Sequence, residues 1–300
     1  MNTKSAYTID GEQRLSGTEI LVGVPALDLT SSLDGGQAFR WKRELEGYRG
    51  VVGNRAVHLT LIGGTLTVKV MGGSVDSTFY SQISDYLDLE FDLTAFRGRH
   101  QSDLRVTGAM DRYRGLRVLR QEPWECLVSF ICSAISNVPR IKLNVGSLAR
   151  SYGRRVGPGV DDFAFPGPDD LLQAGEGDLR QLGLGFRAPY VINAARVVVR
   201  GDLDLVALRE ASFEEARSAL ISLYGVGEKI ADCVLAFSLD QRRAVPIDRW
   251  VRRAMVEWYG VNSRSNNSCV GEWARKRFGL DGAYVQQYLF HDRRLSRNAK

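Results

Sequence analysis

Residues 223–233 read Leu-Tyr-Gly-Val-Gly-Glu-Lys-Ile-Ala-Asp-Cys. We expect a helix capped at Ser212 to end at Tyr224, and a second helix to begin just after Gly227. Because Gly225 and Gly227 permit positive φ and close backbone approach, the turn can present free N–H groups. Together with the positive end of the second helix dipole, these groups form an anion site suited to a phosphate. A tight turn whose glycines serve only packing is the alternative interpretation.

Lys229 lies in the first turn of the second helix, where the helix dipole disfavours a cation. Cys233 follows four residues later and so shares its face. Dipole repulsion and partial burial both favour the neutral amine that a nucleophilic lysine requires. A surface lysine that binds phosphate as a point charge explains the same local pattern equally well.

Asp248 stands in the segment Val245–Val251, which reads VPIDRWV. Pro246 favours an extended entry, and we expect Asp248 to cap a helix over Arg249–Tyr259. The other interpretation is a carboxylate that points into a cleft and stabilises positive charge developing on a sugar. One residue can do both.

The composition narrows the class of protein. The 300-residue chain has a net charge of +5 and a pI near 9.1, with seven lysines and 33 arginines. Arginine suits bidentate phosphate contact, although a genome-wide arginine bias produces the same count. The four scattered cysteines indicate a reducing interior and argue against zinc and iron–sulfur sites, so we expect no metal and no cofactor. The polar N-terminus and the lack of a long apolar run predict an intracellular protein without a membrane segment.

The apolar pattern changes along the chain. Residues 37–71 alternate apolar and polar positions around the turn signals Gly53-Asn54 and Gly63-Gly64, which indicates an antiparallel β-meander. Helical spacing follows from about residue 75. We therefore predict an α+β fold with a small antiparallel β-rich N-terminal lobe, residues 1–105, and a large all-helical region, residues 106–300.

Five ordered blocks carry a family resemblance. The hairpin followed by AVPIDRWVRR resembles the helix-hairpin-helix and catalytic aspartate of the DNA glycosylase superfamily, and more narrowly of the 8-oxoguanine DNA glycosylases. The further blocks that match this family are GGQAFRW (35–41), SFICS (129–133) with PRI (139–141), LGLGFRA (182–188) and QQYLF (286–290).

The resemblance implies that the helical region has two lobes with the active-site cleft between them. It also implies roles for individual residues. Lys229 would attack C1′ of a damaged nucleotide, and Asp248 would stabilise the charge that develops there. The flipped base would be held by a pocket in which Gly36 offers a carbonyl to the N7 hydrogen, Gln286 binds the Watson–Crick edge, and Cys233 and Phe290 sandwich the ring. Residues expected at the DNA are Asn137, Arg140, Phe186, Arg187, Gly225, Gly227 and Trp250. Without the resemblance, the preferred interpretation of Phe186 is a loop aromatic that packs on the core.

Three positions depart from the family pattern. Tyr224 replaces a proline before the hairpin, and Trp250 replaces a histidine after the aspartate. Ile135 stands where the family hydrogen-bonds the base opposite the lesion, and isoleucine cannot do so, which puts a strict preference for cytosine in doubt.

The sequence favours a monomeric bifunctional glycosylase and lyase that acts on double-stranded DNA containing an oxidised purine. A monofunctional alkyl-purine glycosylase that uses Asp248 alone, and a non-catalytic DNA-binding protein, are the alternatives.

Overall fold

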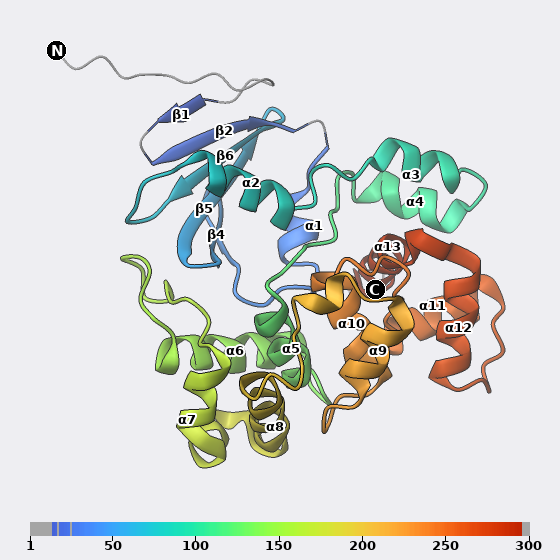
Figure 1. Cartoon of the computed structure of the whole chain (residues 1–300). Coiled ribbons are helices and arrows are strands. Elements are labelled where there is room, and N and C mark those ends of the chain that lie inside the picture. Colours follow the sequence, from blue (N-terminus) through green and yellow to red (C-terminus); the bar gives the residue numbers. More distant parts are fainter. Residues whose placement is uncertain (1–13, 17, 25, 296–300) are drawn as a thin grey trace.

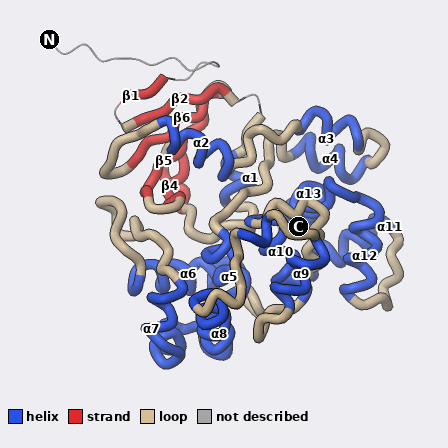
Figure 2. The backbone as a smooth tube through the Cα atoms, viewed as in Figure 1, coloured by secondary structure: helices blue, strands red, loops and turns tan. Residues whose placement is uncertain are grey.

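The computed structural model describes residues 14–16, 18–24 and 26–295. A β-sheet lies at the N-terminal end, and helices make up most of the remaining chain (Figures 1 and 2). This arrangement confirms the predicted α+β class. Within the described ranges, none of the helices combines the length and apolar character that crossing a bilayer requires.

Within the described part of the chain, the sheet has six strands in the order β1-β2-β6-β5-β4-β3, and all neighbouring strands are antiparallel. The predicted meander is confirmed, because Leu59 and Val68 are buried and pair across β5 and β6. The strands are β1 (Arg14–Ser16), β2 (Glu19–Gly23), β3 (Lys42–Glu44), β4 (Gly47–Val52), β5 (Arg55–Ile62) and β6 (Thr65–Val70).

Two strands and one helix at the N-terminal end are absent from the sequence-based prediction. They are β1, β2 and the short helix α1 (Leu29–Leu33). β2 pairs with β6, so that Ile20 lies opposite Val68. A five-residue strand has too little internal alternation to stand out, and its pairing depends on residues far along the chain.

The helices after the sheet are α2 (Ser77–Tyr86), α3 (Leu93–Arg99), α4 (Leu104–Arg112), α5 (Pro123–Cys132), α6 (Val138–Tyr152), α7 (Pro168–Leu179), α8 (Ala188–Val199), α9 (Phe213–Ile221), α10 (Glu228–Ser238), α11 (Arg249–Tyr259), α12 (Asn267–Phe278) and α13 (Gly282–Leu295). Short helical turns occur at η1 (Arg180–Leu184), η2 (Gly185–Arg187), η3 (Ala207–Arg209) and η4 (Gly279–Asp281).

Local capping sets several of these boundaries. The predicted capping box is present, since Ser212 Oγ accepts from the Glu215 amide at 3.3 Å and the Glu215 carboxylate accepts from the Ser212 amide at 3.0 Å. α9 nevertheless ends at Ile221, three residues earlier than predicted, and Ser222 is its C-cap. α10 begins at Glu228 and α11 spans Arg249–Tyr259, as predicted.

The helices form two groups that meet through α5 and α10. In Figure 1, α5 to α8 lie together on one side, and α9 to α13 lie together on the other. α5 packs against α10, which joins the two groups, while α4 packs against α13. A hydrophobic cluster that includes Phe130, Val234 and Tyr288 runs through the helical region, and a second cluster that includes Leu59 and Phe79 lies beneath the sheet.

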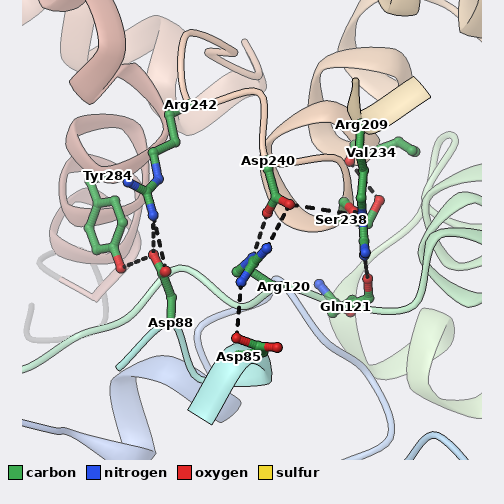
Figure 3. Close-up of polar contacts among 10 residues, drawn as sticks. All are labelled: Asp85, Asp88, Arg120, Gln121, Arg209, Val234, Ser238, Asp240, Arg242 and Tyr284. Atoms are coloured by element: carbon green, nitrogen blue, oxygen red, sulfur yellow. Dashed lines mark hydrogen bonds and ion pairs between the residues drawn. The ribbon is translucent and has the colours of Figure 1, made fainter. Parts of the chain in front are cut away.

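A polar network ties the N-terminal part to the C-terminal helices (Figure 3). The Arg242 guanidinium donates to the buried Asp88 carboxylate at 3.1 and 3.2 Å, and the Tyr284 hydroxyl donates to it at 2.8 Å. Nearby, Arg120 forms a bidentate ion pair with Asp240, with hydrogen bonds of 2.6 and 2.8 Å. Because these pairs join segments more than 100 residues apart, they hold the chain after α2 and before α5 against α13 and the loop that follows α10.

Candidate active site

Lys229 is the second residue of α10 and is half-buried. Its Nζ donates a hydrogen bond to Ser133 Oγ at 2.8 Å and lies 5.2 Å from the centroid of the Phe130 ring. The Ser133 hydroxyl donates its own proton to the Phe130 carbonyl at 2.6 Å, so its oxygen is free to accept from the amine. The end of α5 therefore holds the lysine side chain in one orientation.

Asp248 caps α11, as the sequence predicts. Its Oδ1 accepts from the amides of Trp250 at 2.9 Å and Val251 at 2.8 Å. The cap uses one of the two carboxylate oxygens, so the other is not needed to cap the helix. Burial raises the pKa of Asp248, against the lowering effects of the Val251 amide and the Lys229 charge.

Cys233 lies one helical turn after Lys229 and is buried. Burial raises the pKa of its thiol to about 12, while the charge of Lys229 lowers it and that of Asp248 raises it again. The three side chains therefore lie within electrostatic reach of one another, and Cys233 presents a neutral thiol at neutral pH. A neutral sulfur suits contact with a planar ring.

The predicted pocket residues on α13 lie close to the glycine loop that follows α1. Gly36 has a φ of +83°, and a Cβ placed on it would lie 3.3 Å from Cε1 of the Phe290 ring. Gln286, one turn earlier on the same helix face, is buried, and its Oε1 has no hydrogen-bond partner among the residues that the structure describes. A buried amide oxygen without a donor is costly, and such a group is typical of a site that binds a ligand.

The two glycines of the hairpin between α9 and α10 differ in backbone conformation and in how closely other residues approach them. Gly225 has a φ of +84°, and a Cβ on it would lie 2.2 Å from Cγ of Tyr190. Gly227 has an ordinary φ of −95° as the N-cap of α10, and nothing lies within 4 Å of the position of its Cβ. Gly225 is thus required by backbone conformation and by close packing, whereas Gly227 leaves the first turn of α10 open and without a side-chain cap.

The loop between α5 and α6 lies against the η1–η2 segment. The buried Arg187 donates to the carbonyls of Ala134 at 2.7 Å and Ile135 at 2.9 Å, and Arg140 donates to the carbonyl of Gly183 at 3.0 Å. Asn137 caps α6 by accepting from the Arg140 amide at 3.0 Å. The guanidinium of Arg187 is therefore engaged with the backbone of this loop in the structure, and its predicted contact with DNA stays a prediction.

Two side chains project from these adjoining loops into solvent. Ile135 is 91% exposed, and Phe186 is 43% exposed. Phe186 packs edge-to-face on Tyr190, whose ring packs edge-to-face on Tyr224 of the hairpin. This aromatic row connects the η2 turn with the hairpin, so Phe186 does not pack into the core, which was the alternative for it. Trp250 is half-buried beneath the guanidinium of Arg249, which lies 4.8 Å from its ring centroid.

The comparison with protein families identifies the chain. Residues 19–127 match the model of the 8-oxoguanine DNA glycosylase N-terminal domain, and residues 128–277 match the model of the HhH-GPD superfamily of base-excision DNA repair proteins. The chain belongs to the HhH-GPD superfamily. The resemblance that the sequence blocks indicated is thereby confirmed.

Known relatives of this HhH-GPD protein cover most of its length. It is 31% identical over 254 residues to a protein of Methanothermobacter thermautotrophicus described as "Probable N-glycosylase/DNA lyase", which covers 78% of this chain and 80% of the relative. A structure titled as MBOgg1 in complex with a low affinity DNA ligand has a TM-score of 0.90 at 32% identity and covers 96% of this chain and 100% of the other. The 8-oxoguanine glycosylase/lyase of Clostridium acetobutylicum, in complex with double-stranded DNA containing cytosine opposite 8-oxoguanine, has a TM-score of 0.89 at 28% identity, with the same coverage.

The sequence-based prediction assigned no role to two residues that contact the predicted site residues. Ser133 accepts the hydrogen bond from Lys229, and Arg294 lies over the Phe290 ring with its guanidinium carbon 5.4 Å from the centroid. Ser133 falls inside a matched block, which was the only sequence signal for it. Arg294 lies four residues beyond the last matched block, and only the packing of α13 reveals it.

Proposed function

We infer that this protein excises 8-oxoguanine from duplex DNA and then cleaves the strand by β-elimination. One observation carries this inference: Lys229, held by its hydrogen bond to Ser133 Oγ in the first turn of α10, lies within electrostatic reach of the partly buried carboxylate of Asp248, which caps α11 with one of its two oxygens. The matched N-terminal glycosylase model and the lyase names of the relatives support the same conclusion.

The reaction uses the two groups in succession. The Lys229 nitrogen forms a bond to C1′ as the C1′–N9 bond breaks, and the base leaves with a proton. The Asp248 carboxylate stabilises the positive charge that develops on the sugar. Ring opening produces a Schiff base, loss of a C2′ proton expels the 3′ phosphate, and water then hydrolyses the Schiff base to release the lysine.

The target base must leave the stack before this chemistry, because the duplex shields its glycosidic carbon. We propose that the flipped base lies between Cys233 and Phe290, with its Watson–Crick edge on Gln286. The unsatisfied Oε1 of Gln286 supports this assignment. The Gly36 carbonyl accepts the N7 hydrogen of 8-oxoguanine, whereas guanine presents an acceptor there and is rejected.

The DNA backbone and the gap left by the flipped base require a separate surface. We propose that the amides after Gly225 and Gly227 bind a phosphate. Phe186 enters the gap, Arg187 contacts the orphaned base opposite it, and Asn137, Arg140 and Trp250 contact the DNA around the lesion. The exposure of Phe186 and the uncapped start of α10 support this assignment. We further propose a monomer that acts on DNA inside the cell, with domains at residues 1–105 and 106–300.

Borohydride trapping tests the proposal. On a duplex with 8-oxoguanine opposite cytosine, we expect the native protein to yield a covalent adduct and Lys229→Gln to yield none. Lys276→Gln is the matched control, because Lys276 is an exposed lysine paired with Glu272 on α12. Base release by the native protein without an adduct would instead indicate a monofunctional glycosylase. Equal binding of damaged and undamaged duplexes without any product would indicate a non-catalytic DNA-binding protein.

A further inference from the structure

The Asp34–Gly36 loop, which bears the Gly36 carbonyl, is held from one side by Gln37. The Gln37 side chain is fully buried, and its Nε2 donates to the carbonyls of Ser32 at 2.9 Å and Arg117 at 2.7 Å. Its Oε1 accepts from the Leu119 amide at 2.9 Å. The residue after Gly36 is therefore anchored in the N-terminal core, while Gly36 itself has a positive φ that does not by itself specify one orientation.

α13 holds the same loop from the other side. Gln287 Nε2 donates to the Gly35 carbonyl at 3.3 Å, and Arg294 Nη2 donates to the Asp34 carbonyl at 3.0 Å. Gln287 and Arg294 are seven residues apart, about two helical turns, so they lie on one face of α13. The helix that carries Gln286 and Phe290 thus also anchors the loop opposite them.

Arg294 contacts both the loop and the ring that faces the base. Its guanidinium carbon lies 5.4 Å from the Phe290 centroid, and a Cβ on Gly36 would lie 3.0 Å from its Nη1. A planar guanidinium can lie on a ring and donate in its own plane at the same time, which an ammonium cannot do. Burial lowers the pKa of Arg294, while the carboxylates of Asp34 and Asp248 raise it.

We propose that Arg294 is a positioning residue that sets the distance between the Gly36 carbonyl and the Phe290 ring, and thereby determines discrimination of 8-oxoguanine from guanine. The proposal rests on the proposed function of the site. Discrimination by one acceptor depends on its placement to within about 0.5 Å, because guanine differs from the lesion there by a single hydrogen. A carbonyl free to swing would bind both bases.

The test measures binding and lyase chemistry separately. In a Lys229→Gln background, which does not excise, the ratio of dissociation constants for undamaged and 8-oxoguanine duplexes reports discrimination. We expect Arg294→Lys to lower this ratio roughly tenfold, which is what loss of one hydrogen bond from a charged group produces. With Lys229 present, Arg294→Lys should cleave a preformed abasic duplex at the native rate, because that substrate has no base and the charge near Asp248 is kept.

Arg293→Lys is the matched control. Arg293 is the adjacent arginine, but it pairs with Glu257 and lies over Trp258, so its substitution should leave the ratio unchanged. Unchanged discrimination in both Arg294→Lys and Arg294→Gln would overturn this inference alone. Equal losses in lesion binding, undamaged binding and abasic cleavage would also overturn it, since they indicate general destabilisation. A Lys229→Gln parent without any preference for the lesion would overturn the proposed function as well.

Discussion

Gly225 offers the sharpest test of how the hairpin is built. Its φ of +84° is disfavoured for a residue with a side chain, and a Cβ there would lie 2.2 to 2.5 Å from three atoms of the Tyr190 ring. The left-handed conformation costs about 1–2 kcal/mol for alanine, and overpacking costs about 1–3 kcal/mol. We therefore expect Gly225→Ala to lower the free energy of unfolding by about 2–5 kcal/mol.

Gly227→Ala is the comparison within the same turn. Gly227 has a φ of −95° and open space where a Cβ would be, so we expect a change within about 1 kcal/mol. Urea unfolding of both variants followed by circular dichroism measures the difference. Equal stabilities for the two variants would refute the argument that positive φ and the Tyr190 contact define the hairpin.

Gly225→Ala should also affect DNA binding through the aromatic row. Tyr190 packs at 4.9 Å from Tyr224 and at 6.1 Å from Phe186, measured between ring centroids. Because Phe186 packs on Tyr190, displacement of Tyr190 should also displace the exposed Phe186 ring. The affinity for an abasic duplex should therefore fall at temperatures where the variant is still folded. Full affinity in the folded variant would show that Phe186 does not depend on this row.

Three further predictions concern other groups. Ile135 has a φ of +47°, which a β-branched residue disfavours and asparagine tolerates, so Ile135→Asn should raise the unfolding free energy by about 1 kcal/mol. The variant should also show a stronger preference for cytosine opposite the lesion, measured as the ratio of single-turnover excision rates for cytosine and for the other bases. One added hydrogen bond predicts a ratio roughly fivefold higher than that of the native chain. Identical ratios for the variant and the native chain would contradict this. Burial raises the pKa of Asp248, and we propose that its carboxylate is the active form, so activity should be lost on acidification at a pH above the ordinary aspartate value of about 3.9; an acid limb at or below that value would count against the assignment. Burial alone would raise the pKa of Asp281, but hydrogen bonds from Arg99 and His100 lower it to about 2. Its contribution to stability is therefore present above about pH 4 and is lost as the pH falls toward 2, so Asp281→Asn should flatten the pH dependence of unfolding in that window.

Local patterns were sufficient to predict several of the helices and strands, whereas the roles proposed for the site residues came from the family resemblance. The capping box at Ser212 and the cap at Asp248 act through residues two or three positions away, so the chain itself encodes them. The alternation around Val57 and the paired turn glycines likewise define the meander from neighbouring residues. The end of α9 was predicted three residues too late, because helical spacing continues past the point where Ser222 ends the helix.

Contacts across long separations were decided only by the tertiary structure. Lys229 and Ser133 are 96 residues apart, and Arg294 and Asp34 are 260 residues apart. No periodicity links such positions, because they meet only after the sheet, α5 and α13 have packed. The sequence alone determined that Lys229 lies in the first turn of a helix after a glycine hairpin and that Asp248 caps the next helix. Packing determined that Ser133 orients Lys229 and that Arg294 holds the loop at Gly36, since hydrogen-bond geometry depends on the relative positions of elements far apart in the sequence.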